Sequence, residues 1–269
     1  MHPIERLRYV ARASGVSHAL AVRESASAMR SFVREPHALV TACRRMIDRQ
    51  PAIAPLWWLG ARLLTAPDPA VEIERVLAEL ADDSTVRELE FAVPANSSVC
   101  VIGWPDLVGE ALLRRGDLRV LVVDVRREGS GFVARLMQAD VDCDDVPVEG
   151  MAQAIAASDL VILEASAACP TEVLAVSGSY AAAVIARRLE VPVWLGMGVG
   201  RLLPANMYAA LVERAGLDNE PWHQDNERLP ADLVDVVIGS AGVRDAAVAL
   251  RDVTCPVAPE LMKDRRDID

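Results

Sequence analysis

The stretch VSGSYAAAVIARRLEVPVWLG, from Val176 to Gly196, joins a turn of small residues to an alanine-rich helix and a short β-branched strand. The turn itself is Ser-Gly-Ser, which carries almost no side-chain chemistry. Two interpretations explain such a turn. Either it caps the helix and does nothing more, or its backbone N–H groups face an anionic ligand, which the field at a helix N-terminus stabilises.

The same alternation of strand and helix runs through the preceding sequence. Short β-branched runs recur with amphipathic helices between them, which is typical of right-handed βαβ units and a parallel sheet. Such a sheet binds ligands at the carboxyl ends of its strands, so the loops after the strands form the candidate site. The predicted strands are 99–103, 118–124, 141–148, 159–165 and 191–196, and the predicted helices are 106–116, 131–140, 150–158, 178–190 and 205–215.

The first part of the chain has a different pattern. It contains no convincing strand, and its apolar residues recur at helical spacing. Trp57 and Trp58 lie in a very apolar segment and are expected to be core or interface anchors. We therefore predict a helical domain over residues 1–92 and a Rossmann-like α/β domain over 93–269. The helical positions are Ile4, Leu7, Val10 and Ala11, then Leu39, Ala42, Cys43 and Met46, then Ile73, Val76, Leu77 and Leu80.

The charge balance excludes several classes of function. The formal net charge is −11, so a phosphate backbone would be repelled overall and no nucleic-acid partner is expected. Lys263 is the only lysine of the chain. A single lysine in a polar tail removes lysine Schiff-base chemistry and a Walker A loop.

The cysteines and the lengths of the apolar runs predict where in the cell the protein is located. The five cysteines are scattered, with no C-x-x-C pair and no histidine at ligand spacing, which argues against a zinc site or a disulfide framework. No apolar run approaches the roughly 20 residues that span a bilayer, and the opening MHPIERLRYV lacks the apolar core of a signal peptide. We expect a cytoplasmic protein that binds no metal, no cofactor and no membrane.

Three predicted strands end in residues that suit a binding site. Gly103 ends the first strand and permits close approach of the backbone to a ligand. Arg126 follows the second strand beside a Gly-Ser-Gly helix entry, where its planar fork suits a phosphate. The alternative is a surface arginine paired with Asp124 or Glu128. The fourth strand ends at Glu164.

Three stretches, taken in order, resemble one known family: CVIGWPDLVGEAL, VLVVDVRREGSG, and SDLVILEASA with SGSYAAAVIARRLEVPVW. The family comprises the alpha, beta and delta regulatory subunits of eukaryotic translation initiation factor 2B. It also includes the aldose–ketose isomerases acting on methylthioribose 1-phosphate and ribose 1,5-bisphosphate. The resemblance implies an α/β fold in which a helical N-terminal domain precedes a Rossmann-like parallel-sheet domain of the NagB/RpiA/CoA-transferase type.

The resemblance also implies a phosphate site in which Arg126 matches the family's phosphate-binding arginine. In the isomerases a cysteine and an aspartate form the acid–base pair, whereas Gly103 and Ser166 stand at those places here. Glu164 and Asp106 are candidate substitutes, at a spacing that differs from the family's. The implied ligand-binding residues are Gly103, Arg126, Ser166, Gly178 and Ser179.

Three functions are therefore open. The favoured one is a non-catalytic regulatory or assembly protein that binds a phosphorylated small molecule, such as a sugar phosphate or a nucleotide. The alternatives are a divergent sugar-phosphate isomerase using Glu164 or Asp106, and an interaction scaffold with a vestigial pocket. The resemblance also implies association through the α/β domain, so we predict a homodimer. Its candidate anchors are Trp194, Met197 and Tyr208.

Overall fold

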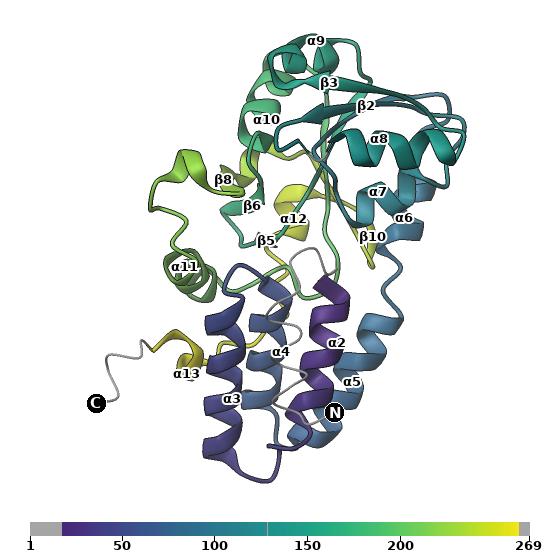
Figure 1. The fold of residues 1–269 in the computed structure, drawn as a ribbon. Helices are drawn as coiled ribbons and strands as arrows, with labels where there is room; N and C mark the ends of the chain where they lie inside the picture. The colour runs from purple at the N-terminus through teal and green to yellow at the C-terminus, as the bar shows by residue number, and fades with distance from the viewer. Residues whose placement is uncertain (1–17, 128, 264–269) are drawn as a thin grey trace. The chain divides into compact units, whose positions relative to one another are not determined.

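The alternating strands and helices form the predicted parallel sheet in the computed structural model, which describes residues 18–127 and 129–263 (Figure 1). Seven strands lie in the order β10-β9-β7-β4-β1-β2-β3, and every neighbouring pair is parallel except β10 and β9. The predicted α/β fold class is confirmed. The strands are β1 (Ser98–Ile102), β2 (Arg119–Asp124), β3 (Asp142–Pro147), β4 (Leu160–Glu164), β7 (Val193–Gly196), β9 (Val236–Gly239) and β10 (Gly242–Asp245).

Helices cover both faces of this sheet. Successive side chains of a strand point to opposite faces. Val99 and Val101 of β1 therefore pack against the helices of one face, while Cys100 and Ile102 point to the other face. Burial on both faces explains why the strands are nearly continuous valine and leucine runs. The helices α6 (Thr85–Ala92), α7 (Leu107–Leu112) and α8 (Gly129–Gln138) pack on one face, and α9 (Met151–Ala156) and α10 (Ser179–Arg188) on the other; α12 (Ala246–Ala249) follows β10.

A second, three-stranded antiparallel sheet lies in the same α/β unit. It consists of β5 (Ala167–Ala168), β6 (Glu172–Val176) and β8 (Asn226–Pro230), in that order. These strands are not predicted from the pattern of residues. β5 has two residues, and the partner of β6 lies about fifty residues further along the chain, so no local pattern marks the pairing.

The helical unit is built around one apolar helix. The helix α4 contacts each of the other five and buries both Trp57 and Trp58, so the prediction that these tryptophans are core residues is confirmed. The predicted helix through Ile4 and Ala11 lies outside the described residues. The helices of the unit are α2 (His18–Met29), α3 (Pro36–Arg49), α4 (Ala54–Thr65), α5 (Pro69–Ala81), α11 (Ala205–Arg214) and α13 (Pro259–Met262).

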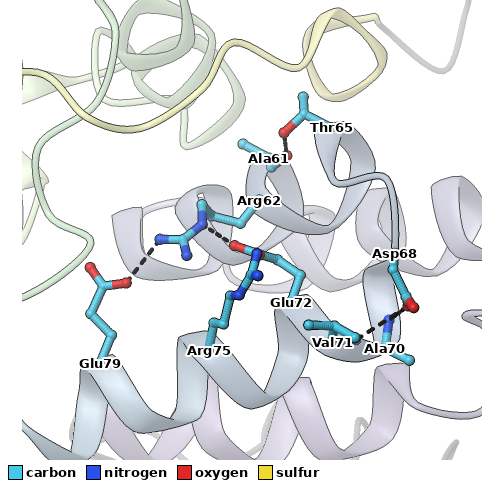
Figure 2. A network of polar contacts seen from close by, with 9 residues as sticks. All are labelled: Ala61, Arg62, Thr65, Asp68, Ala70, Val71, Glu72, Arg75 and Glu79. Atoms are coloured by element: carbon cyan, nitrogen blue, oxygen red, sulfur yellow. Dashed lines mark hydrogen bonds and ion pairs between the residues drawn. The ribbon is translucent and has the colours of Figure 1, made fainter.

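A polar network joins α4 to α5 inside this unit (Figure 2). The guanidinium of Arg62 forms ion pairs with Glu72 and, at 2.9 Å, with Glu79, and it also lies over the ring of Trp58. Burial lowers the pKa of Arg62, and the hydrogen bonds to Glu79 and Glu72 outweigh burial, so the pKa is raised. The Glu72 side chain is only 8% exposed, so the network holds a buried carboxylate.

The two compact units are discontinuous in sequence. The helical unit contains residues 18–82, 199–219 and 253–263, and the α/β unit contains the described residues within 83–198 and 220–252. The predicted domain boundary after residue 92 stays a prediction, because compactness does not show which part of a chain folds alone.

Within the residues that the structure describes, no helix combines the length and apolar character that crossing a membrane requires.

Candidate functional site

The candidate site lies where the order of the sheet reverses, at the adjacent carboxyl ends of β1 and β4. Two glycines with positive φ shape the backbone there: Gly103 at +63° and Gly178 at +101°. A Cβ atom on Gly103 would lie 3.9 Å from the Val125 side chain, and one on Gly178 only 2.7 Å from it. The turn after β1 and the start of α10 therefore meet at one valine, Val125.

The N-terminus of α10 holds a carboxylate from the chain itself. The side chain of Glu227, in β8, accepts hydrogen bonds from the backbone N–H groups of Gly178 at 2.6 Å and Tyr180 at 2.8 Å. The Ser-Gly-Ser turn thus presents bare N–H groups to an anion, and no side chain of the N-cap residue competes for them. The anion in this structure is internal.

Arg126 lies beside the same segment of chain. Its guanidinium forms an ion pair with Asp225, while its backbone N–H donates to the Asp124 carboxylate at 3.3 Å. The hydroxyl of Ser166 donates to the Asn226 side chain at 3.1 Å. Three predicted site residues therefore contact three consecutive residues, 225–227. Arg126 follows β2, Ser166 follows β4, and Gly178 lies in the turn before α10.

Two hydrogen bonds from Ser177 hold the backbone of residues 224 and 225 next to the turn before α10. The N–H of Ser177 donates to the carbonyl oxygen of Asp225 at 3.0 Å, and the Ser177 hydroxyl donates to the carbonyl oxygen of Gln224 at 2.6 Å. We call residues Gln224–Glu227 the acidic segment. Next to it Ser179 is fully buried, and its hydroxyl has no hydrogen-bond partner among the described residues.

Glu164 holds a second helix N-terminus. Its carboxylate accepts from the backbone N–H groups of Leu107 at 2.8 Å and Val108 at 3.0 Å, the first residues of α7. Asp106 stands at the N-cap of α7, and its side chain makes no cap hydrogen bond to the helix. Of the two candidate acid–base residues, Glu164 therefore has a clear structural use, because it satisfies donors that the helix leaves unpaired.

The thiol of Cys100 is also unsuited to acid–base or nucleophilic chemistry. Cys100 lies inside β1, and burial raises the pKa of its thiol to about 12. Such a group stays a neutral thiol at physiological pH and is a poor nucleophile or base. Among the described residues, no group of three or more histidine, cysteine or acidic side chains is arranged to hold a metal ion.

Sequence reasoning missed the residues that occupy the site. Asp225 and Glu227 are separated from Gly178 by more than forty residues, and they reach it only through the pairing of β8 with β6. The single available signal is the polar run QDNE at 224–227, which reads as a surface loop. Whether Gly103, Arg126, Ser166, Gly178 and Ser179 bind a phosphate stays a prediction.

Comparison with known proteins supports the fold. No protein-family model matches the chain, and neither does any curated protein. Among solved structures, eIF2B beta from Chaetomium thermophilum is similar at 18% identity and a TM-score of 0.71, covering 91% of this chain and 86% of that one. The translation initiation factor eIF-2B of Pyrococcus horikoshii OT3 gives 11% identity, a TM-score of 0.73 and coverages of 93% and 98%.

A third neighbour is the tetrameric eIF2B-beta2-delta2 complex from C. thermophilum, at 17% identity and a TM-score of 0.73, with coverages of 92% and 91%. At such identities the likeness shows the fold alone. The chain therefore has the fold of the initiation factor 2B beta and delta subunits, and the resemblance predicted from its sequence is confirmed at that level.

Proposed function

We propose that this protein is a non-catalytic regulatory or assembly protein of the initiation factor 2B type. The observation that carries the proposal is the contact of Glu164 with the first turn of α7. General acid–base catalysis needs two positioned titratable groups. With Gly103 and Ser166 at the places where the resemblance puts the family's catalytic pair, and Glu164 serving as a helix cap, we infer that no such pair acts at the strand ends.

An anion site at these strand ends is the second part of the proposal. Its ligand class is a phosphorylated small molecule, such as a sugar phosphate or a nucleotide. The support is chemical, since the Gly178 and Tyr180 N–H groups and the Arg126 guanidinium already bind carboxylates. A scaffold whose site is permanently closed is the second candidate, and occupancy by Glu227 is the observation that favours it.

The absence of isomerase chemistry is directly testable. We expect the purified protein to convert neither methylthioribose 1-phosphate nor ribose 1,5-bisphosphate to its ketose faster than buffer does, because the resemblance places Gly103 and Ser166 where the isomerases carry their acid–base pair. The measurement is product formation followed by NMR at high enzyme concentration. Turnover that disappears in Glu164→Gln but persists in Glu149→Gln, an acidic residue of a short 3-10 helix after β3, would instead establish a divergent isomerase.

We further propose a homodimer formed through the α/β unit. Of the anchors predicted from the sequence, Tyr208 is buried in α11 of the helical unit, Trp194 packs against the core of the α/β unit, and Met197 is half-buried. Tyr180 and Val184 are better placed, because they lie one turn apart on α10 and are 41% and 48% exposed. One structural neighbour is a tetrameric complex, which makes assembly plausible for this fold.

Light scattering at micromolar concentration tests the dimer. We expect twice the monomer mass for the wild type and a monomer mass for Val184→Arg, because a charge at a buried apolar contact is costly. The matched control is Val71→Arg in the helical unit, where the valine is 45% exposed and the mass is expected to stay that of a dimer. A monomeric wild type would contradict the dimer.

A cytoplasmic location completes the proposal. All five cysteines lie within the described residues and are free, buried thiols. Free thiols without disulfides are typical of a reducing compartment. Fractionation of the native cells, with thiol labelling of the unfolded protein, checks both the location and the redox state.

A further inference from the structure

The acidic segment contacts the predicted anion site with both of its carboxylates. Glu227 accepts from two N–H groups at the start of α10, and Asp225 pairs with the Arg126 guanidinium. These are the kinds of donor that a bound phosphate takes, namely helix N-terminal amides and an arginine fork. The two carboxylates, Asp225 and Glu227, lie two residues apart in one stretch of chain.

We propose that Asp225 and Glu227 are an internal anion that occupies this site and competes with phosphorylated ligands. The inference deepens the proposed function and rests on its anion site. A carboxylate and a phosphate cannot share the same N–H groups, and two further negative charges beside the site repel a phosphate. The stronger the contacts of these two side chains with the site, the lower its affinity for phosphate.

The competitor is displaceable because the Asp225 contact is weak and the Glu227 carboxylate can leave its donors without moving the strand that carries it. The Asp225 side chain is 70% exposed, and ion pairs at such exposure contribute little. Glu227 is fixed by its backbone, which pairs with Ala175 of β6, so rotation of its side chain frees the N–H groups while β8 stays in place. Displacement then costs side-chain contacts and leaves the small sheet intact.

Ser179 gives independent support for a ligand at this place. Ser179 stands between Gly178 and Tyr180 in the chain, and its fully buried hydroxyl has no partner among the described residues. A buried hydroxyl without a partner is destabilising, and Glu227 leaves it unsatisfied. A phosphate has more acceptor oxygens than a carboxylate and suits this additional donor.

Calorimetric titration with inorganic phosphate, at constant ionic strength, tests the competition. We compare the wild type with the double variant Asp225→Asn/Glu227→Gln, in which the amides keep acceptor oxygens but lose the charge. The double variant is expected to bind phosphate at least tenfold more tightly. Adding Arg126→Ala to it is expected to remove most of that gain, because the fork is lost.

The matched control removes two carboxylates elsewhere in the α/β unit. Asp144→Asn/Glu172→Gln has the same net charge, and these residues pair with Arg119 and Arg228 rather than with the site. Its affinity for phosphate is expected to stay within a factor of about two of the wild type. An equal gain in phosphate affinity in the control would overturn the proposed competition but leave the anion site standing. Equal phosphate affinity of the wild type and Asp225→Asn/Glu227→Gln would have the same meaning. No binding by any of the proteins would overturn the anion site as well.

Discussion

Replacing Arg62 by methionine is expected to lower the free energy of unfolding of the helical unit by about 3–5 kcal/mol, the usual result of breaking a buried ion pair by removing one partner. Arg62 holds Glu72, whose side chain is 8% exposed, and its loss leaves that carboxylate, among the described residues, with the 68% exposed Arg75 at 3.4 Å as its remaining ion-pair partner (Figure 2). Urea denaturation followed by tryptophan fluorescence measures the change, because Trp57 and Trp58 lie in this unit.

Two further variants separate the charge from the packing. In the double variant Arg62→Met/Glu72→Met most of the loss is expected to return, because replacing both members of a buried pair by apolar side chains is often neutral. Arg30→Met is the surface control, since its pair with Glu74 at 2.8 Å is 53% and 61% exposed and is expected to contribute less than about 1 kcal/mol. Equal costs for Arg62→Met and Arg30→Met would show that Glu72 is effectively solvated.

Gly178→Ala is expected to destabilise the α/β unit by about 2–4 kcal/mol. Part of this cost is the left-handed backbone, because φ of +101° is unfavourable for any residue with a Cβ atom. The rest is overpacking, since the new Cβ atom would lie 2.7 Å from a methyl group of Val125. Urea denaturation followed by circular dichroism gives the change in free energy.

The control for this substitution is Gly116→Ala in the same unit. The added Cβ atom there would lie 3.8 Å from the nearest atom, the carbonyl oxygen of Asp140, which is ordinary contact. That variant is expected to stay within about 1 kcal/mol of the wild type. If both alanine variants cost the same, the turn before α10 does not require glycine, and the arrangement of N–H groups described for the site would be wrong.

Local chemistry made much of this protein predictable. Asp68 and Pro69 begin α5 in the way their residue types favour, with the Asp68 carboxylate accepting from the N–H groups of Ala70 and Val71 (Figure 2). The valine-rich runs became the central strands because a parallel sheet buried on both faces needs such residues throughout. The expectation that binding residues follow parallel strands also placed Arg126 and Ser166 in one region, since β2 and β4 bring their carboxyl ends to one edge.

The sequence by itself thus determined β1, β2, β3, β4 and β7, the helices between them and the sheet edge proposed for the candidate site, because each depends on residues within about one turn or one strand of one another. The tertiary structure alone decided what the site contains. Glu227 reaches the N–H groups of Gly178 and Tyr180 only because β8 pairs with β6, and Glu164 reaches α7 only because β4 lies beside β1. Such pairings are chosen by the burial of whole elements against each other, a property of the packed chain that no local pattern carries.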